Sequence, residues 1–436
     1  MRWVFWLLAA SFLTQSSFAE EYLIRFKTPD AFKLFMNFKS ARLQSIKSFF
    51  DCKVRRTFSF GSFRALSIDV PRDLVDRIRR SPLVAEVVPN IQFVAYDEHD
   101  FEGWNFNSRF IRRQRGAPRH LSRLSRRSQL PYDFEEEDDN YEGSFNYYYD
   151  NKHRGDGINA YIIDTGIYKE HAEFGGRAVF GEDLTGEGPG DGNGHGTHVA
   201  GIVGSSKYGV AKDITLVEVK ALTAKGQGNL TTVISAMEFA VNHCRSSEGK
   251  GCVINLSLGA IRNSVINQAV KAAHEAGIVV VVAAGNSNIN ACLNSPASAP
   301  EAITVGAFDD RTDSIAKFSN WGSCVDIFAP GVRVKSLASA PHLKPILFSG
   351  TSMASPSITG LAAILLDEGV PYDKIKDYIL KMATNDVFQR RTLVFKPGTP
   401  NRVAFNGVKK NDDKFSNAVY PVVDLDLLIE DLKDSQ

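Results

Sequence analysis

Residues 277–285 read GIVVVVAAG, a short run of β-branched apolar residues enclosed by glycines. Similar runs recur along the chain and alternate with stretches of helical pattern, such as residues 230–244 and 264–277. Strands that are apolar almost throughout are buried on both faces, and helices between successive strands are typical of a parallel sheet. We therefore predict an α/β fold over residues 158–406, with a parallel sheet covered by helices on both faces. The other runs are INAYIID (158–164), ITLVEVK (214–220), CVINLSLG (252–259), AITVGA (302–307) and CVDIFAPG (324–331).

The composition narrows the class of protein. With 436 residues the chain is long enough for a large core and accessory segments, and its 43% hydrophobic content is ordinary for a globular protein. The formal net charge of +1 gives no indication of a nucleic-acid or membrane partner. No run after residue 19 reaches the roughly 18 apolar residues that a membrane-spanning helix needs.

Residues 1–19 are predicted to be a secretory signal peptide. Arg2 precedes an apolar run from Trp3 to Ala10, and small residues precede the expected cut after Ala19. A charged start, a short apolar stretch and a small-residue cleavage site identify such signals, and this run is too short to span a bilayer comfortably. We expect a soluble, secreted protein in a compartment that permits disulfides.

Residues 20–97 are predicted to form a separate, smaller α+β domain. The pattern indicates a strand, a helix, two strands, a second helix and a final strand, AEVVPNIQFVAY at residues 85–96. Pro71 marks the start of the second helix, and Leu74 and Ile78 follow at helical spacing. This order, βαββαβ, is the ferredoxin-like arrangement.

Residues 98–157 are predicted to be a charged linker. Eight arginines lie within residues 109–127, and EEEDD follows at residues 135–139. Blocks of opposite charge with little apolar periodicity indicate an exposed, mobile chain. A nucleic-acid patch is disfavoured because no aromatic platforms are interleaved with the arginines. The expected accessible maturation sites are the dibasic pairs Arg112-Arg113 and Arg126-Arg127.

Three residues that could act together stand where an α/β sheet forms its active sites, beyond the carboxyl ends of strands. Asp164 ends the strand INAYIID, His195 lies in DGNGHGTHVAGIVG, and Ser352 begins the apolar helix SMASPSITGLAAILL. Singly, each has a structural interpretation: a turn residue, a hydrogen-bonded core histidine and a helix N-cap. Together they supply a nucleophilic serine, an imidazole that accepts its proton, and a carboxylate that orients and stabilises the imidazole.

A fourth residue would complete that chemistry. Asn286 directly follows the run GIVVVVAAG, where its side-chain amide can donate a hydrogen bond. Together with the backbone N–H of Ser352, it would stabilise the oxyanion of a tetrahedral intermediate. The alternative interpretation of Asn286 is an ordinary turn after a strand.

The motifs YIIDTGI, NGHGTHVAGIVG, NLSLG, AAGN and GTSMASPSITGLAA, in this order, closely resemble those of the subtilisin-like serine proteases. YGVAK, SPASAPEAITVGA, FSNWGSCVDIFAPG and GTPNRV favour the proteinase K branch and extend the resemblance over residues 158–406. The chain order Asp, His, Ser is that of subtilisin. The resemblance implies that Asp164, His195 and Ser352 form a catalytic triad and that Asn286 belongs to the oxyanion hole. Ser357 departs from the pattern, because the family usually has a non-catalytic histidine there.

The resemblance also implies how the enzyme is made and how it binds substrate. The domain at residues 20–97 resembles the inhibitory propeptide of these proteases, which chaperones folding and is then cut off. Segments matching Gly226-Gln227-Gly228 and Ser257-Leu258-Gly259 flank an extended peptide and pair with its backbone, which makes recognition largely independent of sequence. Their structural interpretation is a turn and the end of a core strand. We expect a monomeric endopeptidase of broad specificity, made as an autoprocessed zymogen, whose partners are protein substrates and its own propeptide.

No cofactor is implied for catalysis, but a structural metal ion is. In the family, carbonyl oxygens matching Pro300 and Ala302 and a carboxylate matching Asp326 bind calcium, an ion that prefers oxygen ligands. We expect a calcium ion there, and a local ion pair of Asp326 is the alternative.

Five cysteines are present, and Cys52 lies far in sequence from the other four. Four cysteines allow three pairings, and their spacing does not choose among them. The segments NACLNSPA and WGSCVDIFAPG resemble a disulfide-bearing pair in thermophilic relatives, which implies a disulfide Cys292–Cys324. We expect Cys244–Cys252 as the second disulfide.

Other functions remain open at this point. A catalytically silent binding scaffold would keep the fold but usually loses a triad residue, and none is missing here. An esterase or lipase would carry GxSxG, whereas this chain has GTSMA. A basic-site processing protease is a narrower alternative that would need an acidic cleft. The tail, residues 407–436, falls outside the match, and its segment VVDLDLLIEDL is either a short amphipathic helix or a removable piece.

Overall fold

The structure is a computed structural model that describes six stretches of the chain: residues 20–41, 53–95, 99–101, 111–132, 145–340 and 343–408. The predicted signal peptide, the acidic run at residues 135–139 and almost all of the predicted tail lie outside the described residues. The chain divides into two compact units, Met1–Ile91 and Gln92–Gln436. Among the described residues, no helix has the length and apolar character needed to cross a membrane.

The first unit contains the predicted elements in the predicted order. Its four strands form one sheet in the order β2-β3-β1-β4, and β1 pairs antiparallel with both of its neighbours. Apolar residues of both helices, among them Ala31 and Leu74, pack on this sheet as a small core of their own. The elements are β1 (Glu20–Phe26), α1 (Pro29–Ala41), β2 (Val54–Phe60), β3 (Phe63–Val70), α3 (Arg72–Arg79) and β4 (Val84–Pro89).

The final strand predicted for this unit is two strands. β4 ends at Pro89, and the next strand, β5 (Gln92–Ala95), belongs to the second unit. Proline has no N–H to continue a ladder, and it is confined to strand ends and edges. The prediction of one continuous strand up to residue 96 was therefore wrong.

A largely parallel sheet forms the centre of the second unit, as predicted. Its order is β10-β11-β9-β13-β15-β17-β19-β23-β22, and β18 pairs with β17. The pairs from β10 to β23 in this order are parallel, whereas β22 and β18 are antiparallel additions. The strands are β9 (Ile158–Asp164), β10 (Ala178–Asp183), β11 (Thr215–Lys220), β13 (Gly251–Leu256), β15 (Val279–Ala283), β17 (Ile303–Asp309), β18 (Ser314–Ile315), β19 (Ile327–Pro330), β22 (Thr384–Asn385) and β23 (Arg402–Val403).

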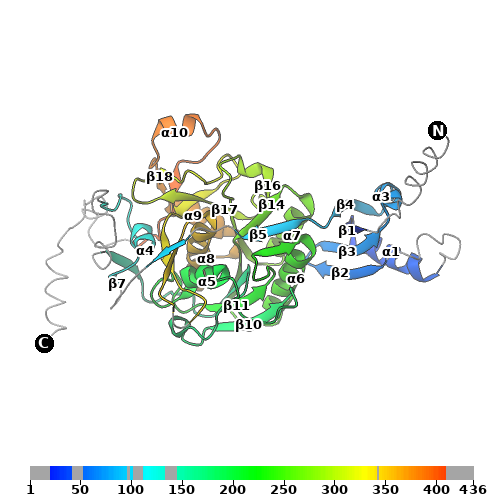
Figure 1. The fold of residues 1–436 in the computed structure, drawn as a ribbon, viewed down its shortest axis with the longest axis horizontal. Coiled ribbons are helices and arrows are strands. Elements are labelled where there is room, and N and C mark those ends of the chain that lie inside the picture. The colour runs from blue at the N-terminus through cyan, green and yellow to red at the C-terminus, as the bar shows by residue number, and fades with distance from the viewer. Residues whose placement is uncertain are drawn as a thin grey trace, which may run out of the picture. The chain divides into compact units, whose positions relative to one another are not determined.

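Helices cover both faces of this sheet. α5 packs against α8 and α6 packs against α7, and both pairs can be followed in Figure 1. Local sequence sets where they start: Asn229 and Thr232 form a reciprocal capping box for α6, and the side chain of Asn263 caps α7. The helices are α5 (His195–Gly204), α6 (Leu230–Ser246), α7 (Ser264–Glu275), α8 (Thr351–Asp367), α9 (Ile375–Met382) and α10 (Arg390–Val394).

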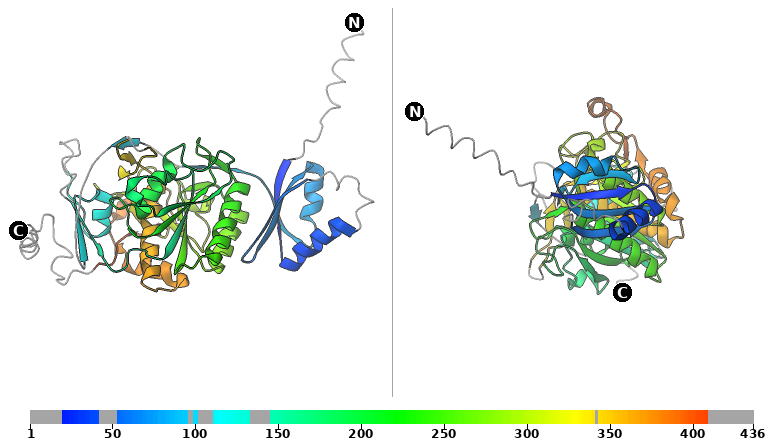
Figure 2. Two further views of the ribbon diagram at one scale, coloured as in Figure 1. Left: turned by 90° about the horizontal axis from the view of Figure 1, so that it is seen from below. Right: turned by 90° about the vertical axis from the view of Figure 1, so that its right-hand side faces the viewer.

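The predicted exposed linker is instead folded into the second unit over residues 111–132 and 145–157. It forms β7 (Ile111–Arg115), α4 (Arg119–Leu124) and β8 (Asn146–Asp150), and β7 pairs with β8 along its whole length (Figure 2). Leu121 and Tyr147 are fully buried and belong to the main hydrophobic core. Arg123 is also fully buried, and its guanidinium contacts both carboxylate oxygens of Asp313 at 3.0 Å.

The dibasic pairs predicted as cutting sites lie in this folded segment, and their four arginines are half-buried. Arg112 and Arg113 lie within β7, in the ladder with β8. The guanidinium of Arg127 lies 4.2 Å from the ring centroid of Phe405 and donates to the carbonyl of Ala383. The run of arginines suggested solvated chain because nothing near it in the sequence identifies its partners. Asp313, the partner of Arg123, is 190 residues away in the sequence.

Because of two buried histidines, we expect the folded protein to lose stability in acid. Nε2 of His120 in α4 contacts the carbonyl of Tyr208 at 3.0 Å, and Nε2 of His198 in α5 contacts that of Ile346 at 3.1 Å. Burial lowers the pKa of His120 to about 4 and that of His198 to about 3, from an ordinary 6.5. Below pH 6.5 the unfolded chain therefore binds protons that the folded protein does not. The free energy of unfolding should fall as pH drops from 6.5 toward 4, by about 1.4 kcal/mol per histidine and pH unit.

This is checked with urea unfolding midpoints between pH 7 and pH 4.5, measured on a chain that carries Ser352→Ala to prevent self-digestion. The variant His120→Gln, whose amide can keep the contact with the Tyr208 carbonyl, should show a shallower pH dependence by about one proton. Equal slopes with and without His120 would contradict the prediction.

Candidate active site

The carboxyl edge of the sheet brings Asp164 and His195 together as predicted. Asp164 is the last residue of β9, and His195 is the first residue of α5. Oδ1 of Asp164 lies 2.6 Å from Nδ1 of His195 and also accepts the backbone N–H of Thr165 at 2.7 Å. Both side chains are fully buried. A carboxylate at Nδ1 holds an imidazole in the orientation and tautomer that leave Nε2 as the proton acceptor.

Asp191, which the sequence analysis missed, shapes the loop that presents His195. Its Oδ1 accepts from the Thr165 hydroxyl and the Gly194 N–H, both at 2.8 Å. Its Oδ2 accepts from the N–H and the hydroxyl of Thr197, at 2.8 and 2.6 Å. The sequence feature that indicates this role is an aspartate directly before Gly-Asn-Gly. In such turns the aspartate carboxylate usually accepts hydrogen bonds from the backbone N–H groups that follow.

Gly196 allows the close approach between this helix start and the loop after β9. A Cβ atom at Gly196 would stand 2.1 Å from the carbonyl oxygen of Gly166, so no larger residue fits without a shift of the backbone. The small residues after His195 thus bring α5 close to Asp164.

Ser352 lies at the start of α8 and is fixed to the neighbouring strand end. It is the second residue of α8, fully buried, and its hydroxyl donates to the carbonyl of Ser257 at 3.1 Å. The Ser257 hydroxyl in turn donates to the carbonyl of Ser352 at 3.0 Å. This reciprocal pair holds the first turn of α8 against the end of β13.

Asn286 is oriented by Thr351, a second residue that the sequence analysis missed. Oδ1 of Asn286 accepts both the backbone N–H of Thr351, at 2.9 Å, and its hydroxyl, at 2.7 Å. Because a backbone N–H requires an acceptor, the oxygen of the Asn286 amide faces Thr351 and its NH₂ is the end that can donate elsewhere. That is the orientation an oxyanion donor needs.

The two predicted substrate-binding segments are strands, and β5 lies between them. They form β12 (Gln227–Asn229) and β14 (Leu258–Ile261), in a sheet of order β12-β5-β14-β16, where β16 is Asn294–Ser295. Val94 of β5 pairs with Gln227 on one side and Gly259 on the other. The carbonyl of Gly226, just before β12, accepts from the N–H of Ala95 at 3.0 Å. β12 and β14 therefore pair with an extended segment of this same chain through its main chain.

The three predicted calcium ligands converge, but on a lysine. The ammonium of Lys376 lies 3.2 Å from the carbonyl oxygen of Pro300, 2.7 Å from that of Ala302 and 2.8 Å from Oδ2 of Asp326. A positive group therefore already contacts one oxygen of each of the three predicted ligands. The residues present do not fit a calcium ion, and the alternative interpretation, an ion pair of Asp326, describes the structure better.

Three other side chains that can bind metals lie close together. Ligand atoms of Asp150, His153 and Glu368 lie within 4.8 Å of one another, among the residues that the structure describes. Nδ1 of His153 lies 3.1 Å from Oδ2 of Asp150, which is an ordinary, partly exposed polar contact.

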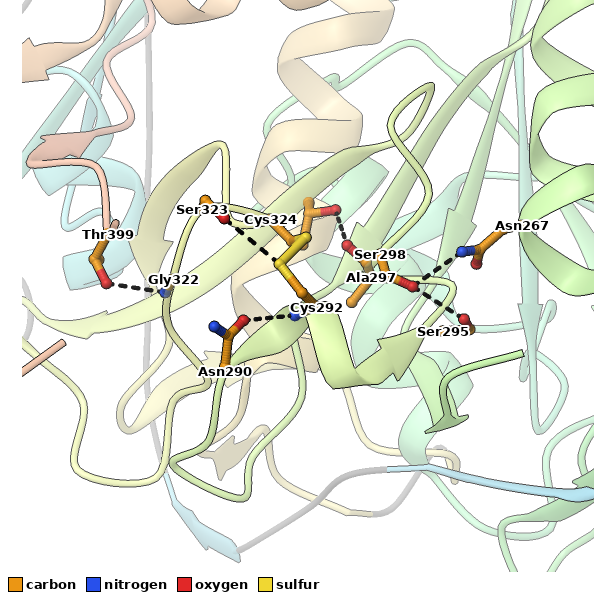
Figure 3. Close-up of a disulfide and its surroundings, with 11 residues drawn as sticks. Asn267, Asn290, Cys292, Ser295, Ala297, Ser298, Gly322, Ser323, Cys324 and Thr399 are labelled. Carbon is orange, nitrogen blue, oxygen red and sulfur yellow. Dashed lines mark hydrogen bonds between the residues drawn. A yellow bond between two sulfur atoms is a disulfide. The ribbon is translucent and has the colours of Figure 1, made fainter. Parts of the chain in front are cut away.

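Both expected disulfides are present. Cys292–Cys324 joins a short 3₁₀ helix (Ala291–Leu293) to the segment before β19, with Cα atoms 5.3 Å apart, and Asn290 accepts the N–H of Cys292 beside it (Figure 3). Cys244–Cys252 links the end of α6 to β13, with Cα atoms 6.3 Å apart. Cys52 lies outside the described residues.

Comparison with known proteins agrees with this α/β architecture. The Subtilase family matches residues 155–407. The subtilase-type proteinase RRT12 of Saccharomyces cerevisiae is 47% identical over 443 residues, which cover 97% of this chain and 89% of the relative. Proteinase T of Parengyodontium album is 45% identical over 278 residues, covering 63% of this chain and 89% of the relative.

A solved structure gives the same result. The crystal structure of a cold-adapted subtilisin-like serine proteinase is similar with a TM-score of 0.58 and 36% identity, and the match covers 67% of this chain and 100% of that one. The fold is thus that of the subtilisin-like α/β hydrolytic enzymes. The chain belongs to the subtilase family of serine proteases.

Proposed function

We propose that the protein is a secreted serine endopeptidase in which His195 accepts the proton of the Ser352 hydroxyl as Oγ attacks a peptide carbonyl. Asp164 stabilises the imidazolium that forms, through the 2.6 Å contact with Nδ1. The Asn286 amide and the backbone N–H of Ser352 stabilise the oxyanion. Collapse of the intermediate expels the amine, which takes the proton from His195, and leaves an acyl-enzyme on Ser352. Water, deprotonated by His195, then releases the acid.

The observation that carries this proposal is the position of β5. A piece of polypeptide lies antiparallel between β12 and β14, in the manner of a peptide substrate added to a sheet. Pairing through the main chain sets few limits on side chains, which supports a broad specificity. Two disulfides in the described chain support maturation in an oxidising compartment and hence secretion.

The same strand supports synthesis as an inactive precursor. β5 directly follows the first unit in sequence, and while it lies between β12 and β14 no other peptide can pair there. Further along the chain, β6 (His99–Phe101) pairs with β21 (Ile346–Phe348), the strand that leads to Ser352. On one side of the proposed cut, the chain pairs with β12 and β14 through β5. On the other side, it pairs with β21 through β6. We place the first self-cleavage between residues 95 and 99, and the unit that contains residues 20–91 acts as the propeptide.

The test combines covalent labelling with hydrolysis of a protein substrate. A fluorophosphonate probe, which reacts with activated serine hydroxyls, should modify the secreted protein on the tryptic peptide that contains Ser352, and labelling should abolish hydrolysis of unfolded casein. Mass spectrometry of the labelled peptide identifies the serine. Labelling of another serine, or casein hydrolysis that survives complete labelling, would refute the assignment.

A further inference from the structure

The oxygens that were expected to hold calcium form a built cation site. Two backbone carbonyls, of Pro300 and Ala302, and the carboxylate of Asp326 point to one position, and the Lys376 ammonium lies there. Three acceptors match the three N–H donors of an ammonium group. Each of the three N–H groups of Lys376 thus has an oxygen acceptor.

The site is held in shape by contacts that do not involve the lysine. The Thr304 N–H donates to Oδ2 of Asp326 at 2.9 Å, and the Asp326 N–H donates to the carbonyl of Thr304, also at 2.9 Å. The Thr304 hydroxyl donates to the carbonyl of Ala297 at 2.9 Å. The oxygens would therefore stay near their places if Lys376 were removed.

The position of Lys376 is also set by the packing of its own helix, α9. Lys376 is the second residue of α9, and its neighbour Ile375 is fully buried in the main core together with Ile379. Burial of these two residues sets the rotation of α9, so the Lys376 side chain starts from a defined position. Its contacts tie α9 to the segments before β17 and β19.

Lysine and calcium exclude each other at this position. Calcium takes six to eight oxygen ligands at about 2.3–2.6 Å. Any such ion on these oxygens would stand next to the ammonium, and like charges at that distance repel strongly. We propose that Lys376 permanently replaces a calcium ion, so that this site stabilises the protease without metal. Removing the lysine should uncover a working calcium site.

The experiment measures melting temperature with and without calcium. All variants are full chains that carry Ser352→Ala, so that no self-digestion occurs and the readout does not depend on activity. Lys376→Ala should lower the melting temperature of the larger unit by roughly 3–8 °C in EDTA. Millimolar calcium should restore at least half of that loss, because solvent reaches the side chains of Asp326 and Lys376, which are 20% and 29% exposed. With Lys376 in place, calcium should not raise the melting temperature through this site.

The controls separate this site from others. Lys374→Ala, two residues earlier, removes only an exposed pair with Asp373 and should neither lower the melting temperature comparably nor create a calcium response. Adding Asp326→Asn to Lys376→Ala should abolish the rescue, and magnesium, which keeps its own waters, should not replace calcium. Lys376→Met, which retains the apolar stem, serves if the alanine variant does not fold.

Two results would overturn the proposal. The first is a calcium-dependent rise in melting temperature with Lys376 present that disappears in Asp326→Asn, since the site would then bind calcium beside the lysine. The second is the absence of a calcium response in both Lys376→Ala and Lys376→Met, since the oxygens would then form an ordinary ion pair and no metal site. Calcium titration by calorimetry on the same variants gives an independent reading.

Discussion

Replacing Ser352 with alanine should lower turnover of peptide substrates roughly a million-fold, which is the loss found for the corresponding change in subtilisin, a member of the same family. The variant lacks the hydroxyl oxygen that we propose forms the acyl-enzyme, while the proposed oxyanion donors remain. For the same reason the secreted variant should keep all residues before the cut that we place between residues 95 and 99. Intact mass of the secreted products, wild type beside variant, measures both the cut and its position.

Ser357→Ala is the matched control for this experiment. Ser357 is also fully buried in α8, five residues further on, and its hydroxyl has no hydrogen-bond partner within the described part of the chain. The control should be processed and active like the wild type. If Ser352→Ala loses the same N-terminal segment as the wild type, another protease makes the cut. If it also hydrolyses casein at the wild-type rate, the mechanism is wrong and the protein is better described as a scaffold with a contaminating activity.

Replacing Asp164 with asparagine should lower kcat about ten-thousand-fold with little change in KM. The carboxylate is fully buried and accepts from Nδ1 of His195 at 2.6 Å and from the N–H of Thr165 at 2.7 Å. An amide of the same shape carries no charge to stabilise the imidazolium. If its NH₂ group turns toward the ring, it also holds the wrong tautomer. Steady-state kinetics on a peptide anilide separates kcat from KM.

Asp183→Asn controls for the loss of a carboxylate at the same edge of the sheet. Asp183 ends β10, two strands from β9, and accepts the backbone N–H groups of Thr185 and Gly188 at 2.8 Å. Its replacement should change kcat less than about tenfold, because its partners lie in its own turn. A drop of less than tenfold in Asp164→Asn would show that this carboxylate orients nothing that the reaction needs.

Much of the fold, and the pairing of Asp164 with His195, could be predicted because the signals are local. The run of four valines at residues 279–282 is typical of a strand that is buried on both faces, and β15 is fully buried. Asp164, His195 and Ser352 each stand where a strand ends or a helix begins, and such ends meet at one edge of a parallel sheet. The pairing of the four described cysteines came from family resemblance, because their spacing left three possibilities open.

What the sequence by itself determined was therefore the set of elements and the residues at their ends: the apolar strands, the helices with their caps, and the order Asp164, His195, Ser352. Only the tertiary structure decided which charges are solvated. Arg123 was expected in an exposed linker and is buried against Asp313, and Lys376 had no recognised role and stands at the predicted calcium position. The physical reason is that burial and ion pairing depend on partners distant in sequence, whereas strand periodicity and helix caps depend on neighbours along the chain.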